Sequence, residues 1–323
     1  MSADLGLVGD IGGTNARFAL TERKGGAIQL VQPKIHINRD YPSAEAAIDA
    51  YLAEVGGARP SSVVLSVAGP VTDGAIEFTN LDWELSEDHL RRHGGFASAQ
   101  LINDFGAQAL GATRVPPGGL RRIGPAVPGL KAGAIAVLGP GTGFGVGALV
   151  RDGGREVVLA SEGGHAGFAP VEEIEVEIWR WFARRHDRVS IERVLSGPGL
   201  FELYKALAEI EGAKPVYVDQ RQVQAAATSG DALAAATVDR FCKVLGSTAG
   251  DIALTFGARG GVYVSGGVAV GLVDAIGSGG FRARFEAKGR FEDYMRDIPT
   301  FVVLEPYAAL LGAASLLPPL EAS

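Results

Sequence analysis

The sequence predicts a two-lobed protein of the α/β class, in which each lobe contains a strand–turn–strand hairpin. A hairpin with a glycine-rich turn is expected at residues 5–20, and a second one at 137–149 repeats its plan. Apolar runs typical of buried strands, such as 62–68, alternate with segments of helical spacing, such as 43–55. This alternation is typical of α/β folds.

The first hairpin turns at residues 10–15, DIGGTN. Gly12 and Gly13 let the backbone adopt positive φ angles and approach a ligand with no Cβ in the way, and Thr14 and Asn15 add side-chain donors. Such a turn can bind a phosphate through its N–H groups. The alternative is a tight turn whose glycines serve only the chain reversal, because short glycine motifs are common.

Asp10 lies at the mouth of this turn, where its carboxylate would repel a phosphate unless a cation lay between them. The sequence therefore indicates Mg²⁺ near Asp10. The second hairpin has a comparable turn at Gly141-Thr142-Gly143, about 130 residues further along the chain. Neither turn is a P-loop, because no lysine follows the glycines. Two such hairpins favour a duplicated fold that binds one nucleotide between its halves.

Composition limits the partners. The 323 residues are 47% hydrophobic and 21% charged, as in soluble globular proteins of two domains. A net charge of −7 argues against a nucleic-acid surface.

The uncharged segment 132–150 reads as two strands rather than a membrane span because of its glycines and Pro140. The N-terminus lacks the pattern of a signal peptide, so a cytoplasmic protein is expected, with Cys242 packed in a core.

Asp104 is expected at the carboxyl end of a strand. Residues 100–103 read as this strand, and 105–112 as the helix that follows it. Ligands and catalytic groups collect at that edge of open α/β sheets. The alternative is that Asp104 only caps the helix, since aspartate is a favoured N-cap residue.

Glu162 and His165 are the only titratable residues of the glycine-rich segment 161–170. An acid and an imidazole in a loop with almost no apolar residues favour a ligand site over a core. Glu192 lies in the segment 190–195, which is expected to start another helix, and it is also compatible with a plain surface glutamate.

A third glycine turn, Gly266-Gly267, follows the strand expected at 262–265. Such a turn would let an adenine ring approach the backbone.

Taken in order, these motifs resemble the bacterial ATP-dependent glucokinase family, within the actin, hexokinase and heat-shock ATPase superfamily. The resemblance runs nearly from end to end. It implies an actin-like (ribonuclease H-like) fold, with a small lobe of residues 1–110 completed by a C-terminal helix at 304–323 and a large lobe of 111–303. The segments that carry it are 10–17, 102–107, 141–145, 161–165, 192–199, 266–267 and the tail from Gly280 to Phe291.

The resemblance implies that the protein transfers the γ-phosphoryl group of ATP to the 6-hydroxyl of glucose. Asp104 would be the catalytic base, and Asp10 would hold Mg²⁺ through water. A homodimer is the family expectation. The hexose would be bound by Asn103, Asp104, Glu162, His165 and Glu192. The nucleotide would be bound by Asp10, Gly12, Gly13, Thr14, Asn15, Gly141, Thr142, Gly143, Gly266 and Gly267.

Other functions remain open at this point. The same fold could phosphorylate another hexose, such as fructose, mannose or an N-acetylhexosamine. A non-catalytic sugar-binding regulator would normally carry a helix-turn-helix segment and a basic face, which the sequence does not show. In an actin-like filament protein, the acidic residues and histidine assigned to the hexose would have no purpose.

Overall fold

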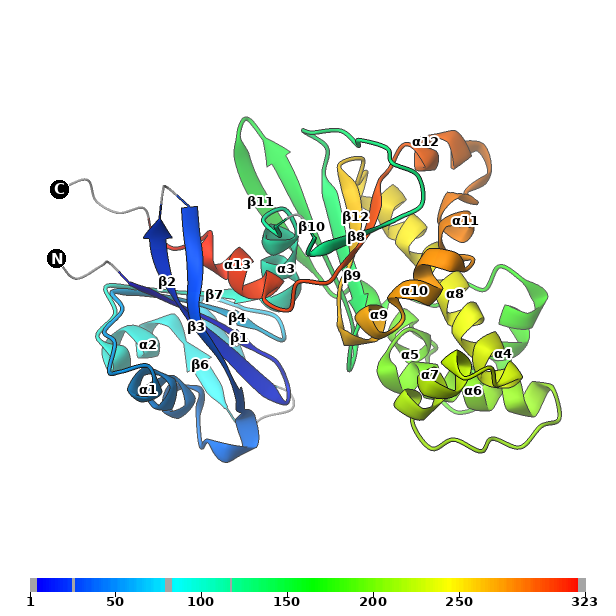
Figure 1. The fold of residues 1–323 in the computed structure, drawn as a ribbon, viewed down its shortest axis with the longest axis horizontal. Helices are drawn as coiled ribbons and strands as arrows, with labels where there is room; N and C mark the ends of the chain where they lie inside the picture. The colour runs from blue at the N-terminus through cyan, green and yellow to red at the C-terminus, as the bar shows by residue number, and fades with distance from the viewer. Residues whose placement is uncertain (1–4, 25–26, 79–82, 117, 319–323) are drawn as a thin grey trace. The chain divides into compact units, whose positions relative to one another are not determined.

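The computed structural model describes residues 5–24, 27–78, 83–116 and 118–318. Contacts between residues divide the chain into two compact units, whose elements are labelled in Figure 1. Unit 1 comprises residues 1–115 and 305–323, and unit 2 comprises 116–304. Each unit contains a mixed sheet with helices, so the predicted α/β class is confirmed. The lobe boundaries implied by the resemblance stay a prediction, and residues 319–323 of its last helix lie outside the described residues.

Unit 1 is built on a five-stranded sheet in the order β3-β2-β1-β4-β7. The first three strands form an antiparallel meander, whereas β4 runs parallel to β1 and β7 parallel to β4. The carboxyl ends of β1, β4 and β7 therefore share one edge. The elements of unit 1 are β1 (Gly6–Ile11), β2 (Asn15–Lys24), β3 (Ala27–Ile37), η1 (Asn38–Asp40), α1 (Ala44–Glu54), β4 (Ser62–Val67), β5 (Ala75–Glu77), β6 (Glu84–Ser86), α2 (Glu87–Gly94), β7 (Ser98–Asn103), α3 (Asp104–Ala112) and α13 (Ala308–Ala314).

Alternate residues of these strands enter two separate cores, as the period of two in a strand requires. Leu7, Phe18 and Leu65 belong to a core that α1 and α2 close. Val8 and Val64, on the opposite face, pack with apolar residues of α13. The sheet of unit 1 is thus covered on both faces, and its edge at the carboxyl ends of β1, β4 and β7 carries the residues of interest.

Unit 2 contains a six-stranded sheet in the order β11-β10-β9-β12-β13-β8. Its first five strands repeat the plan of unit 1, with an antiparallel meander followed by two parallel strands, so the predicted duplication is confirmed. The strands of unit 2 are β8 (Leu120–Ile123), β9 (Ile135–Pro140), β10 (Phe144–Asp152), β11 (Arg155–Ser161), β12 (Gly261–Val264) and β13 (Thr300–Val303). Its helices are η2 (Gly163–His165), α4 (Glu173–Ala183), α5 (Ile191–Val194), α6 (Gly197–Ile210), α7 (Gln220–Thr228), α8 (Ala232–Phe256), α9 (Gly267–Gly271), α10 (Val273–Ser278), α11 (Phe281–Glu286), η3 (Gly289–Phe291) and α12 (Glu292–Arg296).

The long helix α8 passes through the core of unit 2, where Phe241, Cys242 and Leu245 are fully buried. Burial raises the pKa of the Cys242 thiol to about 12, so the thiol stays protonated and acts as an apolar packing group, as predicted. In the described part of the chain, no helix combines the length and the apolar character needed to cross a membrane.

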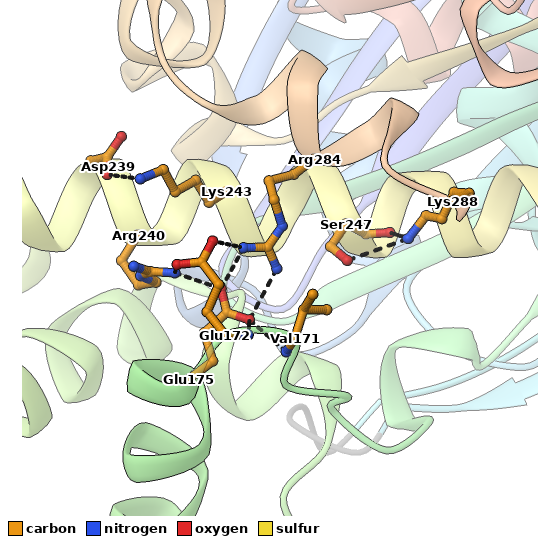
Figure 2. A network of polar contacts seen from close by, with 9 residues as sticks. All are labelled: Val171, Glu172, Glu175, Asp239, Arg240, Lys243, Ser247, Arg284 and Lys288. Carbon is orange, nitrogen blue, oxygen red and sulfur yellow. Dashed lines mark hydrogen bonds and ion pairs between the residues drawn. The ribbon is translucent and has the colours of Figure 1, made fainter. Parts of the chain in front are cut away.

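A cluster of two glutamates and two arginines joins α4 to α8 and α11 (Figure 2). Oε1 of the fully buried Glu175 accepts hydrogen bonds from Arg240 at 2.7 Å and from Arg284 at 2.9 Å. Glu172 bonds the same two arginines. Oε2 of Glu175 also accepts the N–H of Val171 at 2.8 Å. The cluster therefore fixes both the start of α4 and the chain that enters it from residues 161–170.

The Glu175 carboxyl gives this cluster a pH dependence. Burial alone would raise its pKa, but hydrogen bonds from Arg284, the Val171 N–H and Arg240, together with the charge of Arg284, lower it from 4.5 to about 2. A lowered pKa contributes stability above the unfolded-state value, and this contribution is lost as the pH falls toward the folded-state value.

We expect Glu175→Gln to destabilise unit 2 at pH 7 by up to about 3–5 kcal/mol, because Arg240 and Arg284, which are largely buried, keep only the partly exposed Glu172 as a compensating charge. The difference from wild type should shrink as the pH falls from 4.5 toward 2. Thermal unfolding of both proteins at several pH values measures this. Glu177→Gln on the same helix removes an exposed pair with Arg180 and should cost less than about 1 kcal/mol. Equal melting temperatures of Glu175→Gln and wild type at pH 7 would contradict the assignment.

Candidate active site

Three parallel strands of unit 1 end side by side, because the register pairs Ile11 with Val67 and Val67 with Asn103. Asp10 lies one residue before the end of β1. Its Oδ1 accepts a hydrogen bond from the Ser66 hydroxyl at 3.0 Å, and its Oδ2 lies 3.3 Å from Nη1 of Arg17. The two strands that flank β1 thus both contact Asp10, β4 through Ser66 and β2 through Arg17.

Burial raises the pKa of the Asp10 carboxyl above its ordinary value, and Arg17 and Ser66 oppose this shift. The motifs in the sequence predicted no role for Arg17 or Ser66. The signal for Arg17 was present, because Asp10 and Arg17 are opposite each other in the antiparallel pair that the hairpin prediction implies. Because Arg17 already places a positive charge beside Asp10, the Asp10 carboxylate does not by itself require Mg²⁺. Among the described residues, no group of three or more His, Cys, Asp or Glu side chains could hold a metal ion.

The first glycine turn is closed by a hydrogen bond of 3.0 Å from the Gly12 N–H to the Asn15 carbonyl. The expectation of positive φ angles at Gly12 and Gly13 is wrong, because neither glycine adopts one. These glycines instead leave space. A Cβ at Gly13 would meet no described atom within 4 Å, so the protein itself does not require glycine there. The space beside Gly13 is therefore open to a ligand.

Asn103, rather than Asp104, caps α3. Oδ1 of Asn103 accepts the N–H groups of Phe105 at 3.0 Å and Gly106 at 3.1 Å, and its Nδ2 donates to the Gly69 carbonyl at 3.1 Å. Asp104 is the first residue of the helix and is partly buried, with its Oδ1 accepting the Phe105 N–H at 2.9 Å. The alternative that Asp104 is the N-cap is therefore wrong.

Unit 2 brings the segments of Glu162, His165 and Glu192 together. Nε2 of His165 lies 3.8 Å from Oε2 of Glu162, and the two side chains are 64% and 62% exposed. Two backbone hydrogen bonds, of 2.9 and 3.0 Å, tie segment 166–168 to segment 189–191, directly before Glu192. Glu162 and His165 are therefore accessible to a ligand on a segment of fixed backbone.

Glu192 contacts the second glycine turn directly. Its Oε2 accepts the N–H of Phe144 at 2.8 Å, immediately after residues 141–143. This approach requires a glycine, because a Cβ at Gly143 would lie 2.3 Å from that oxygen. A carboxylate predicted to bind sugar and a turn predicted to bind phosphate are thus in hydrogen-bond contact. No local pattern in the sequence predicts this contact, since nearly fifty residues separate its partners.

The third glycine turn lies at the same edge of the unit 2 sheet as the second, because β12 runs parallel to β9. The Ser265 N–H donates to the Leu138 carbonyl at 2.8 Å, which holds the two chains in register. Gly266 adopts a φ of 97°, and α9 begins at Gly267. Unit 2 therefore carries both later glycine turns and the three residues predicted to bind sugar, whereas Asn103, Asp104 and the first turn belong to unit 1.

Sequence comparisons identify relatives over nearly the whole chain. The family model described as glucokinase matches residues 7–319. A glucokinase of Caulobacter sp. strain K31 is 53% identical over 318 residues, which is 98% of this chain and 96% of the relative. A glucokinase of Chromobacterium violaceum is 42% identical over 312 residues, with coverage of 96% and 88%.

Solved structures agree with the sequence comparisons. The crystal structure of a glucokinase from an Antarctic psychrotroph is 36% identical and has a TM-score of 0.88, covering 97% of this chain and 98% of its own. A ROK family glucokinase from Streptomyces griseus, solved in complex with glucose and AMPPNP, shares the fold with a TM-score of 0.66 at 23% identity, with coverage of 97% and 98%. The family match and these relatives show that the chain belongs to the glucokinase family.

Proposed function

We propose that this protein phosphorylates the 6-hydroxyl of D-glucose with ATP, and that Asp104 is the general base. Membership of the glucokinase family supplies the reaction, glucose phosphorylation by ATP. The observation that best supports the residue roles is the hydrogen bond from the Phe144 N–H to Glu192. This hydrogen bond connects the Glu192 carboxylate, which is suited to a sugar hydroxyl, to the turn at 141–143, which is suited to a phosphate, within unit 2.

Phosphoryl transfer depends mainly on positioning and on neutralising charge. Asp104 accepts the proton of the 6-hydroxyl as that oxygen bonds to the γ-phosphorus, while the bond from the γ-phosphorus to the oxygen bridging it to the β-phosphate breaks and ADP leaves. The Asn103 cap fixes the backbone of Asp104 at the start of α3. A positioned general base contributes a factor of about 10² to 10⁴ in rate.

The other polar groups bind the remaining hydroxyls of the sugar. Glu162, His165 and Glu192 offer carboxylate and imidazole groups on unit 2. Asn103 contributes one amide hydrogen, because its Oδ1 caps α3 and its other amide hydrogen bonds Gly69. A site that hydrogen-bonds each hydroxyl rejects a sugar that lacks one by a factor of up to about 10⁴.

The glycine turns bind the nucleotide through backbone N–H groups, with the hydroxyls of Thr14 and Thr142 beside them and Gly266 and Gly267 at the adenosine. Mg²⁺ commonly binds one or two carboxylates, water and substrate phosphates rather than a cage of protein ligands. The single carboxylate of Asp10 fits that pattern, and the ion would neutralise phosphate charge there.

The homodimer and the cytoplasmic location expected from the sequence stay predictions.

Asp104→Asn should lower kcat by about 10² to 10⁴, because the amide cannot accept the proton of the hydroxyl. Binding of glucose and of AMPPNP, measured by calorimetry, should change much less. Asp88→Asn is a suitable control, since Asp88 also lies in the first turn of a unit 1 helix but is exposed. Turnover by Asp104→Asn equal to that of the control would rule out Asp104 as the base.

Gly143→Ala should weaken glucose binding by about tenfold or more, because its Cβ displaces the Glu192 carboxylate from the Phe144 N–H. Only the end of a flexible side chain has to move, so the fold should persist. In Gly141→Ala, the new Cβ would meet no described atom within 4 Å, so glucose affinity should be retained whatever happens to ATP affinity. Calorimetric titration with glucose measures both. Equal glucose affinities of wild type and Gly143→Ala would contradict this role of Glu192.

A further inference from the structure

We infer that Asn38 is a positioning residue that holds the first glycine turn in its phosphate-binding conformation. The inference rests on the proposed role of that turn. Asn38 lies where β3 ends and η1 begins, more than twenty residues beyond the turn, and it is 1% exposed. No motif singled it out in the sequence.

Asn38 bonds two carbonyl groups of the turn. Its Nδ2 donates to the Gly12 carbonyl at 2.7 Å, and its backbone N–H donates to the Thr14 carbonyl at 2.9 Å. The proximity of a carbonyl oxygen identifies the amide nitrogen as the contacting atom. The Tyr41 N–H donates in turn to the Asn38 carbonyl at 3.0 Å, which fixes the backbone of Asn38 itself.

Because the peptide bond is planar, these two hydrogen bonds also determine the direction of N–H groups in the glycine turn. In a trans peptide, the C=O of one residue and the N–H of the next point in opposite directions. With the Gly12 and Thr14 carbonyls directed at Asn38, the N–H groups of Gly13 and Asn15 point away from it. A phosphate attracts N–H groups and repels carbonyl oxygens, so a turn fixed in this way requires no rearrangement before binding.

The side chain of Asn38 acts through its donor. Within the described part of the chain, Oδ1 of Asn38 is buried without a hydrogen-bond partner. A buried polar atom without a partner costs free energy, so packing alone does not account for an amide at this position. Gly13 and Thr14, on the turn that the donor holds, are exposed and accessible to a ligand.

Two variants test the inference. Asn38→Ala removes the Nδ2 donor. Asn38→Asp keeps the shape of the side chain but places a carboxylate oxygen, which cannot donate, against the Gly12 carbonyl. Both should raise the Kd of Mg·AMPPNP, by about three- to tenfold for Asn38→Ala and by more for Asn38→Asp. The Kd of glucose, measured separately by calorimetry, should stay within twofold of wild type.

Ser43→Ala is the matched control. Ser43 caps α1 by accepting the Ala46 N–H at 3.2 Å, five residues beyond Asn38, so this variant loses stability without altering the turn. It should lower Tm and leave both affinities unchanged. The inference is overturned if both Asn38 variants bind Mg·AMPPNP within twofold of wild type, or if they lose glucose affinity by the same factor. Nucleotide binding is measured without turnover, so wild-type protein that binds Mg·AMPPNP but phosphorylates no glucose would refute the proposed function alone.

Discussion

The parallel pairing of each hairpin's first strand with the strands that follow it is the constraint on which the candidate site depends. Parallel strands in register end at one edge, so β1, β4 and β7 bring Asp10, Ser66 and Asn103 together in unit 1. The same plan in unit 2 aligns the turns that follow β9 and β12. Residues far apart in the sequence thereby become neighbours. The duplication applies this arrangement twice, once for each half of the chain.

Hydrogen bonds from the rest of the fold then fix the groups at these edges. A carboxylate holds the backbone after the second turn, through Glu192 and the Phe144 N–H, and an amide holds the first turn through Asn38. The ion cluster around Glu175 fixes the exit of the segment that carries His165. In each case a buried or partly buried polar side chain bonds the backbone, and the ligand-facing atoms remain available. Such preorganisation reduces the free energy that binding has to spend on ordering the site.

The sequence was sufficient to predict the elements and the chemistry at their ends, because these depend on local pattern. The glycine turns, the strand before Asp104 and the helix capped by Ser43 all follow from spacing and residue type. Contacts between distant residues left no such signal. Arg240 and Arg284 lie 65 and 109 residues from Glu175 in the sequence. Asn38 is one asparagine at the end of a strand and belongs to no recognisable motif. The positive φ angles predicted for Gly12 and Gly13 were wrong because open space around a turn also favours glycine.

The measurement that tests the account most directly is phosphorus NMR of the purified protein with Mg·ATP and, in separate samples, glucose, fructose, mannose or N-acetylglucosamine. A sample without sugar controls for ATP hydrolysis. The account predicts that glucose 6-phosphate and ADP form with glucose, and that the other sugars react far more slowly. Phosphorylation of another sugar in preference to glucose, or no sugar phosphate above the control, would contradict it.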